Sequence, residues 1–138
     1  MRKLLIALAL ATTAVANPAQ AQSSEGFGRH LAELINGYRE RNGLAPLTIS
    51  EDLVALAGEH SAEMAAQRVL THEGFDARYT RARSRVCVEN VGWNFQTAEA
   101  LMDGWRHSPA HHRNLLEAKV SRMGIAVDAR YVTFFACL

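Results

Sequence analysis

Residues 105–116 have the sequence WRHSPAHHRNLL, which contains the most informative local signal in the chain. Ser108 followed by Pro109 is a helix-start signal, because serine can cap free backbone amides and proline suits the first helical position. The spacing predicts a short helix that continues to Leu116. Each step along a helix turns the chain by about 100°, so His111 and His112 must point in different directions.

The segments on either side predict both helices and strands. Apolar residues at helical spacing, with cap signals, predict helices over about 27–42, 51–68 and 97–107. Runs of apolar and aromatic residues predict strands over 86–93, 123–127 and 131–136, the last two forming a hairpin. Residues 70–85 are rich in charge, and we expect them to be irregular or briefly helical. Helices around a first strand, followed by a hairpin, predict a layered α+β sandwich.

The chain length and the N-terminus predict one exported domain. The 138 residues suffice for one domain with a core, and their composition is that of a globular protein. Arg2 and Lys3 precede an apolar run over 4–15, and Ala19-Gln20-Ala21 fits a cleavage site. We therefore expect a signal peptide at 1–21, a flexible lead at 22–29 and the domain at 30–138. An uncleaved anchor is the alternative, although the run is short for a membrane span.

The charge balance gives no bulk electrostatic case for nucleic-acid binding. The formal net charge is +1, and cleavage after Ala21 would remove two cations, for a mature balance of about −1. We expect secreted or periplasmic protein without a transmembrane span, and a monomer. A local basic run comprises Arg78, Arg81, Arg83 and Arg85. We interpret it as a solvated loop, with contact to an anionic envelope component as the alternative.

The chain has two cysteines, Cys87 and Cys137. In an oxidising compartment an even count favours one disulfide. If the strand that contains Cys87 lies beside the strand that ends near Cys137, the two sulfurs can meet. Two buried free thiols are the alternative.

Five segments taken together resemble the CAP superfamily, which holds the cysteine-rich secretory proteins, antigen 5 and pathogenesis-related 1 proteins, and in particular its bacterial SCP-like extracellular branch. Asn36 to Leu47 resembles the opening pattern N-x-x-R-x-x-x-G-L-x-P-L. The other four are His60 to Ala65, Leu70-Thr71-His72, Glu89-Asn90-Val91 and the stretch 105–116. The resemblance covers almost the whole mature chain and implies a three-layer α-β-α sandwich.

The resemblance also implies a cleft, which in this superfamily holds two histidines and two glutamates. His72 and His111 match the histidines, and Glu89 matches the first glutamate. Ser108 stands where the second glutamate would be, as in bacterial members with the pattern W-x-x-S-P-G-H-R-x-N. Ala110 and His112 depart from that pattern, which affects the detailed shape of the cleft. We expect His72, Glu89, Ser108 and His111 to line it.

Two functions remain open for this cleft. Two imidazoles and a carboxylate suit zinc or another divalent cation, so His72, Glu89 and His111 are candidate metal ligands. They are also the candidate catalytic residues of a metal-dependent hydrolase, in which Glu89 could act as a base on bound water. No complete catalytic motif is visible, however. We therefore favour a binding module for an extracytoplasmic ligand, a lipid, glycan or envelope partner.

Other polar and aromatic residues have simpler interpretations. We expect His60, on the apolar face of its helix, to be a hydrogen-bonded core histidine. We expect His107 and His112 to be exposed or at a rim. Ser61 and Ser108 lack the setting of an acyl-transfer nucleophile, and Ser108 is expected to cap its helix. The aromatic residues expected in the core are Trp93, Trp105, Phe134 and Phe135.

Overall fold

The structure, a computed structural model, describes residues 23–138. The predicted signal peptide at 1–21 lies outside the described residues. The helices are α1 (Ser24–Arg41), α2 (Glu51–Gln67), α3 (Phe75–Arg81), α4 (Ala98–His107) and α5 (Pro109–Leu115), and the strands are β1 (Thr48–Ile49), β2 (Cys87–Trp93), β3 (Arg122–Asp128) and β4 (Tyr131–Cys137). Among these residues, no helix is both long and apolar enough to cross a membrane.

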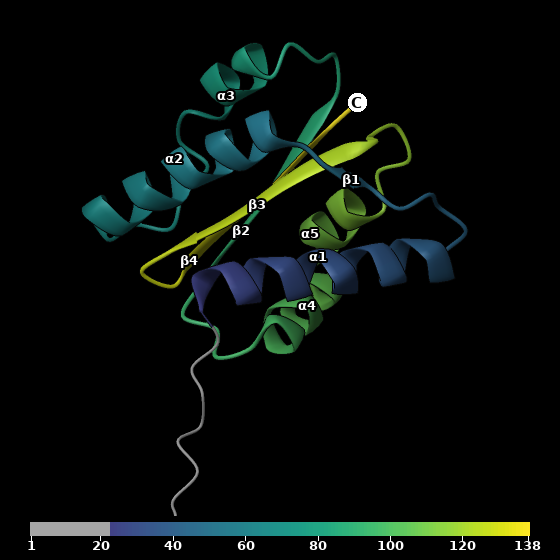
Figure 1. Cartoon of the computed structure of the whole chain (residues 1–138), viewed down its shortest axis with the longest axis horizontal. Coiled ribbons are helices and arrows are strands. Elements are labelled where there is room, and N and C mark those ends of the chain that lie inside the picture. Colours follow the sequence, from purple (N-terminus) through teal and green to yellow (C-terminus); the bar gives the residue numbers. More distant parts are fainter. Residues whose placement is uncertain (1–22) are drawn as a thin grey trace, which may run out of the picture.

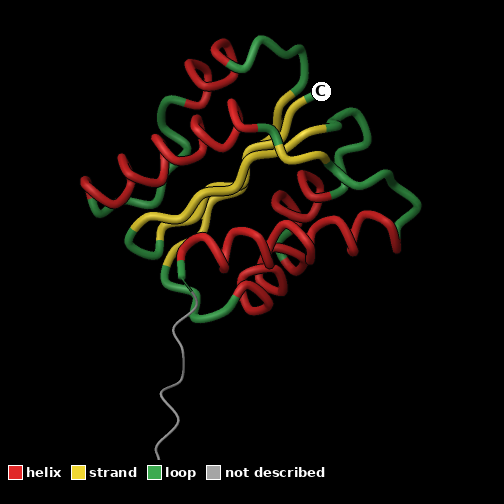
Figure 2. The backbone as a smooth tube through the Cα atoms, viewed as in Figure 1, coloured by secondary structure: helices red, strands yellow, loops and turns green. Residues whose placement is uncertain are grey.

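The described residues form three layers, as predicted. A single sheet in the order β1-β3-β4-β2 lies between two groups of helices. Helices α2 and α3 cover one face of the sheet, and α1, α4 and α5 cover the other (Figures 1 and 2). The architecture is therefore an α-β-α sandwich, and the predicted hairpin is β3 with β4.

Strand β4 is buried throughout, because both faces of the sheet are covered. Val132, Phe134 and Ala136 belong to the core on the α1 and α4 side. Phe135 and Cys137 belong to the core beneath α2, as expected when successive side chains point to opposite faces. The core prediction is confirmed for Trp105, Phe134 and Phe135, which are buried.

Trp93 was predicted in the core and is not there. It is the last residue of β2 and is 50% exposed. Its ring lies 5.9 Å from that of Tyr131, its partner at the end of β4. The two rings lie together where the pair of β2 and β4 ends.

The predicted flexible lead over 22–29 is wrong from Ser24 onward. Helix α1 begins at Ser24, because Ser23 caps it: the Ser23 hydroxyl accepts a hydrogen bond from the Gly26 amide at 3.1 Å. Thr97 caps α4 in the same way. Ser108 occupies the N-cap position of α5 but makes no side-chain capping bond, so the predicted capping role of its hydroxyl is wrong.

The opening pattern of the chain is explained by two side chains of α1. Asn36 pairs with the backbone of Leu47, accepting from its amide at 2.8 Å and donating to its carbonyl at 2.9 Å. Arg39 is buried and donates to the carbonyls of Ala45, Leu115 and Glu117. These bonds fix the connector after α1 and deliver β1 to the sheet edge, where it pairs in parallel with β3. Strand β1 was not predicted, since two residues are too few to show an alternation.

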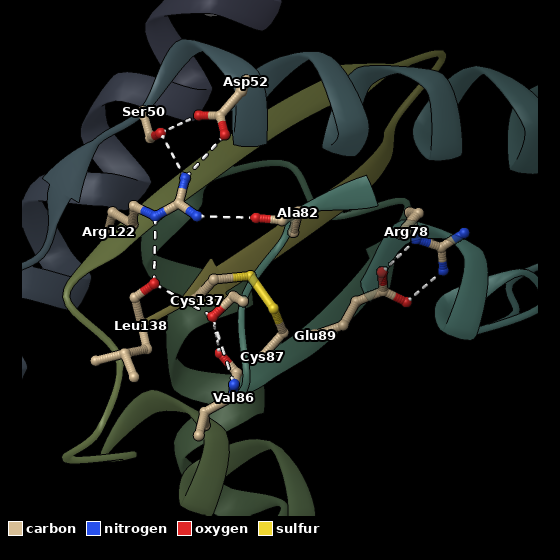
Figure 3. Close-up of a disulfide and its surroundings, with 11 residues drawn as sticks. Ser50, Asp52, Arg78, Ala82, Val86, Cys87, Glu89, Arg122, Cys137 and Leu138 are labelled. Atoms are coloured by element: carbon tan, nitrogen blue, oxygen red, sulfur yellow. Dashed lines mark hydrogen bonds and ion pairs between the residues drawn. A yellow bond between two sulfur atoms is a disulfide. The ribbon is translucent and has the colours of Figure 1, made fainter. Parts of the chain in front are cut away.

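The Cys87–Cys137 disulfide is confirmed (Figure 3). The two cysteines face each other across the antiparallel pair of β2 and β4, with their Cα atoms 4.2 Å apart. The bond closes one end of the strand pair. Glu89 lies two residues further along β2, so the disulfide fixes the strand that carries the candidate site.

Candidate functional site

Glu89 is the centre of the candidate site. It faces the α2 and α3 layer, because it pairs with Phe135 on β4, and its side chain is 1% exposed. Both of its carboxylate oxygens bind the guanidinium of Arg78. Arg78 Nε donates to Oε2 at 2.8 Å and Nη2 donates to Oε1 at 2.9 Å (Figure 3). This two-bond arrangement is the strongest geometry available to a carboxylate and a guanidinium.

The prediction that Arg78 lies in a solvated loop is wrong. Residues 75–81 form α3, which confirms the brief helix expected in this segment, and α3 turns Arg78 inward. Arg78 is buried and also donates to the Glu73 carbonyl at 2.9 Å. In contrast, Arg81 points to solvent and pairs with Glu59. The spacing of the arginines does not show which of them is buried. Arg78 is the buried one because it is the partner of the buried Glu89.

His72 completes the shell of Glu89 on the solvent side. Its Nδ1 lies 2.9 Å from Glu89 Oε1, and its side chain is 52% exposed. Since an ionised carboxylate only accepts hydrogen bonds, Nδ1 carries the proton that His72 donates to Glu89. His72 therefore keeps Nε2 as the ring nitrogen that Glu89 does not engage.

His60 lies beneath the same carboxylate. It is buried at 1% exposure, as predicted, and its Nε2 lies 3.7 Å from Glu89 Oε1. The same nitrogen lies 2.7 Å from the carbonyl of Thr71 and donates to it. The other nitrogen, Nδ1, is buried without a hydrogen-bond partner. The expectation of a fully hydrogen-bonded core histidine is thus correct for one nitrogen and wrong for the other.

The pKa of Glu89 is lowered despite its burial. Desolvation is the largest single influence and would raise this pKa, but the hydrogen bonds from His72 and Arg78 and the charge of Arg78 together outweigh it. Glu89 is therefore ionised at neutral pH. A carboxylate in this state, with both oxygens engaged, is an anchor for its neighbours.

His111 is held beside this cluster by two asparagines. Asn90, next to Glu89 on β2, donates to the His111 carbonyl at 3.1 Å. Asn114, one turn along α5, donates to the carbonyl of Glu89 at 3.0 Å and to Asn90 Oδ1 at 2.9 Å. These bonds explain why the Glu-Asn-Val and His-x-x-Asn segments occur together: they join α5 to β2.

The environment of His111 lowers its pKa. Burial is the larger cause, and the nearby charge of His72 is the second. His72 and His111 therefore lie close enough to interact electrostatically. Glu89 is hydrogen-bonded to His72, and its backbone carbonyl is bonded to Asn114 on the helix that carries His111. Trp105 packs beside the His111 ring, at 6.2 Å between ring centroids.

Ser108 and His112 were the remaining residues of interest in this stretch. Ser108 is half-buried at the N-cap of α5, and its place in the cleft stays a prediction. His112 turns away from His111, as helical geometry predicted: its Nε2 lies 2.9 Å from the hydroxyl of Tyr38 on α1. His107 is exposed, as expected.

The predicted zinc set fits this geometry only in part. Both oxygens of Glu89 bind Arg78, and Oε1 also accepts from His72, so only one buried lone pair, on Oε2, is left for a metal. In residues 23–138, no group of three His, Cys, Asp or Glu side chains has the geometry to hold a metal ion. The imidazoles of His72 and His111 have suitable donor chemistry, but the three-residue set with Glu89 does not fit.

Comparisons with known proteins agree with the fold. A Bacillus subtilis protein described as the uncharacterized membrane protein YlbC is 25% identical over 114 residues, which are 76% of this chain and 32% of that protein. A solved extracellular protein with an SCP domain from Bacillus anthracis superimposes with a TM-score of 0.79 and 21% identity, covering 91% of this chain and 45% of that one. A cysteine-rich secretory protein from Staphylococcus aureus gives 0.77 and 24%, covering 87% and 40%.

This chain spans less than half the length of each of these three proteins, so the similarity concerns one domain of each. The family model described as the cysteine-rich secretory protein family, CAP, matches residues 32–137. That range runs from α1 to the last residue of β4 and includes His72, Glu89 and His111. The chain therefore belongs to the cysteine-rich secretory protein (CAP) family.

Proposed function

We propose that this CAP domain is an exported binding module, and that His72 and His111 form the ligand-facing part of a site built on Glu89. The observation that carries the proposal is the state of Glu89. A general base needs a free lone pair and a pKa near the working pH. Glu89 meets neither need, because Arg78 and His72 take up three of its four lone pairs and lower its pKa, and the fourth lone pair is buried.

The arrangement of the histidines supports a role in recognition. His72 is half-exposed on its segment before α3, and His111 is partly buried on α5. Each ring can donate or accept a hydrogen bond; the His72 ring is fixed by its bond to Glu89, and the backbone of His111 is fixed by Asn90. Two such groups, held by separate layers around one buried ion pair, form a preorganised polar surface. Hydroxyl and phosphate groups, which glycans and lipid headgroups carry, match it chemically.

Export of the chain belongs to the same proposal. The basic start, the apolar run and the Ala19-Gln20-Ala21 site support it, and the disulfide suits an oxidising compartment. Protein recovered from the periplasm or the culture fluid should begin at Gln22. Recovery of the mature protein with Met1 intact would contradict it.

A hydrolase at the same residues is the second candidate, and the orientation of His72 favours it. Glu89 holds Nδ1 and leaves Nε2 free, as in sites where a carboxylate orients a catalytic or metal-binding histidine. In this case His72 would be the proton-transfer group and Glu89 its positioning residue. A divalent cation on His72 and His111 would supply Lewis acidity when bound.

One set of assays separates the two candidates. Purified protein is titrated with glycans and with phospholipid vesicles, and is incubated with ester and glycosidic substrates. The binding proposal expects saturable binding that His72→Ala weakens, with no turnover. Turnover that is lost in His72→Ala and in Glu89→Gln would replace it with the hydrolase. Glu59→Gln, on the exposed face of α2, is the control that should change neither result.

A further inference from the structure

A second cluster of polar side chains lies beside the candidate site, in a separate cavity. The cavity has a volume of about 260 Å³ and lies between α2 and the turn before α3. Its lining residues are His60, Glu63, Met64, Gln67, Thr71, Glu73 and Gly74. Two of them are glutamates and none is lysine or arginine. The cavity thus favours a cation.

His60 lines this cavity, and its Nδ1 is buried without a hydrogen-bond partner. His60 Nε2 donates to the Thr71 carbonyl at 2.7 Å, so the lone pair of a neutral His60 ring is on Nδ1. That lone pair is buried and unpartnered, and leaving it so costs free energy. A metal-ligating histidine typically donates its second ring nitrogen to a carbonyl or carboxylate in this way.

The carboxylate of Glu63 lies at a ligand-to-ligand distance from the same nitrogen. The two residues are three apart on α2, so they share a face of the helix. Nδ1 and Glu63 Oε2 are 3.5 Å apart without forming a hydrogen bond. Two ligands at about 2.1 Å from a tetrahedral zinc ion lie about 3.4 Å apart. Glu63 is 61% exposed and is free to adjust to an ion.

We propose that His60 and Glu63 form a divalent-cation half-site, selective for zinc or a similar borderline ion, that is distinct from the His72 and His111 site. Imidazole nitrogen and carboxylate oxygen are ligands that zinc prefers. No group of three His, Cys, Asp or Glu side chains in residues 23–138 could hold a metal ion, so the remaining coordination positions would be left to water. The ion would connect the buried end of the Glu89 network to solvent, because His60 Nε2 lies 3.7 Å from Glu89.

The test uses the mature chain carrying His72→Ala and His111→Ala, which removes the other histidine site. Zinc is added in a calorimeter, and the ring nitrogens of His60 are followed by ¹⁵N NMR. We expect one bound zinc ion and a large shift of the Nδ1 signal. Adding Glu63→Gln should weaken binding at least about 10-fold, by analogy with the loss of groups that support metal ligands. The matched control, Glu51→Gln at the start of α2, should leave the affinity unchanged.

Three results would overturn the proposal: no zinc binding to the double variant, equal affinity after Glu63→Gln, or binding without a shift at Nδ1. The first would mean that water alone occupies the cavity. Glu63 and Glu51 are both exposed, so neither substitution removes a core contact. Urea unfolding of each variant without zinc checks that the fold is intact.

Discussion

Arg78→Met should be strongly destabilising, because it leaves Glu89 buried without its main partner. Methionine keeps most of the volume of the side chain and removes the charge. Breaking a buried ion pair by removal of one partner costs about 3–5 kcal/mol. We place this variant near 3 kcal/mol at pH 7, since Glu89 retains its bond to His72. Against a total stability on the order of 5–15 kcal/mol, this is a large fraction.

The pH dependence of this loss identifies its cause. In the wild type the pKa of Glu89 is lowered in the folded state, so its contribution is present at neutral pH and is lost as the pH falls through that pKa. Without Arg78, burial dominates and raises the pKa of Glu89 in the folded state. Folding then takes up a proton, and the variant is least stable at high pH. The difference between the two proteins should therefore shrink as the pH falls from 7 toward 4.

Urea unfolding at several pH values measures the effect. With a slope of about 1.5 kcal/mol per molar, a loss near 3 kcal/mol lowers the midpoint by about 2 M at pH 7. Arg78→Met combined with Glu89→Gln should recover part of the loss, because no buried charge remains. Arg81→Met on the same helix, which breaks only an exposed pair, should hardly move the midpoint. A shift for Arg78→Met that equals that of Arg81→Met, or that is independent of pH, would refute this reasoning.

Three further predictions follow from the structure. Gly124→Ala should destabilise the fold by about 3 kcal/mol, because the new Cβ would lie 2.1 Å from the backbone of Leu53. The control Gly58→Ala finds only ordinary contacts and should be neutral or stabilising. Equal shifts of the urea midpoint in the two variants would contradict this prediction. Replacing Cys87 and Cys137 by alanine should cost about 4 kcal/mol in the chain-entropy model for the observed separation of 50 residues; two reactive thiols in unfolded, unreduced wild-type protein would show that there is no disulfide. The pKa of His111 should lie below that of a free histidine, so protonation of His111 opposes folding as the pH falls through the pKa of the free side chain. NMR of His72→Ala should show a partial rise in the pKa of His111, because the effect of burial remains. An unchanged pKa of His111 would exclude coupling of the two rings.

The layered fold could be predicted from the sequence because its signals are local. Helical spacing in α1, α2 and α4, the proline at the start of α5 and the hairpin each depend on neighbouring residues. Strand β1 and the exposed position of Trp93 were missed for the opposite reason. Both depend on contacts between residues distant in the sequence: β1 is placed by bonds from Asn36 and Arg39, and Trp93 is half-exposed at the end of β2, beside Tyr131 of β4.

The candidate site could likewise be predicted only in part. The resemblance to the family selected His72, Glu89 and His111, and the structure brings His72 and Glu89 into contact with His111 alongside. The resemblance did not select Arg78, which is the principal partner of Glu89 and was interpreted as part of a solvated run. A glutamate in a strand buried on both faces must have a cation nearby, and that requirement is the one signal that could have identified it.

We propose that Glu89 acts as an ionised anchor and not as a base. The most direct test is the pKa of its carboxyl group, measured by ¹³C NMR on protein labelled at glutamate, with Glu89→Gln to assign the signal. We expect the pKa of Glu89 to lie below that of an ordinary glutamate and to rise when Arg78 is replaced by methionine. A carboxyl group that titrates near pH 7 would have the properties of a general base and would contradict the account.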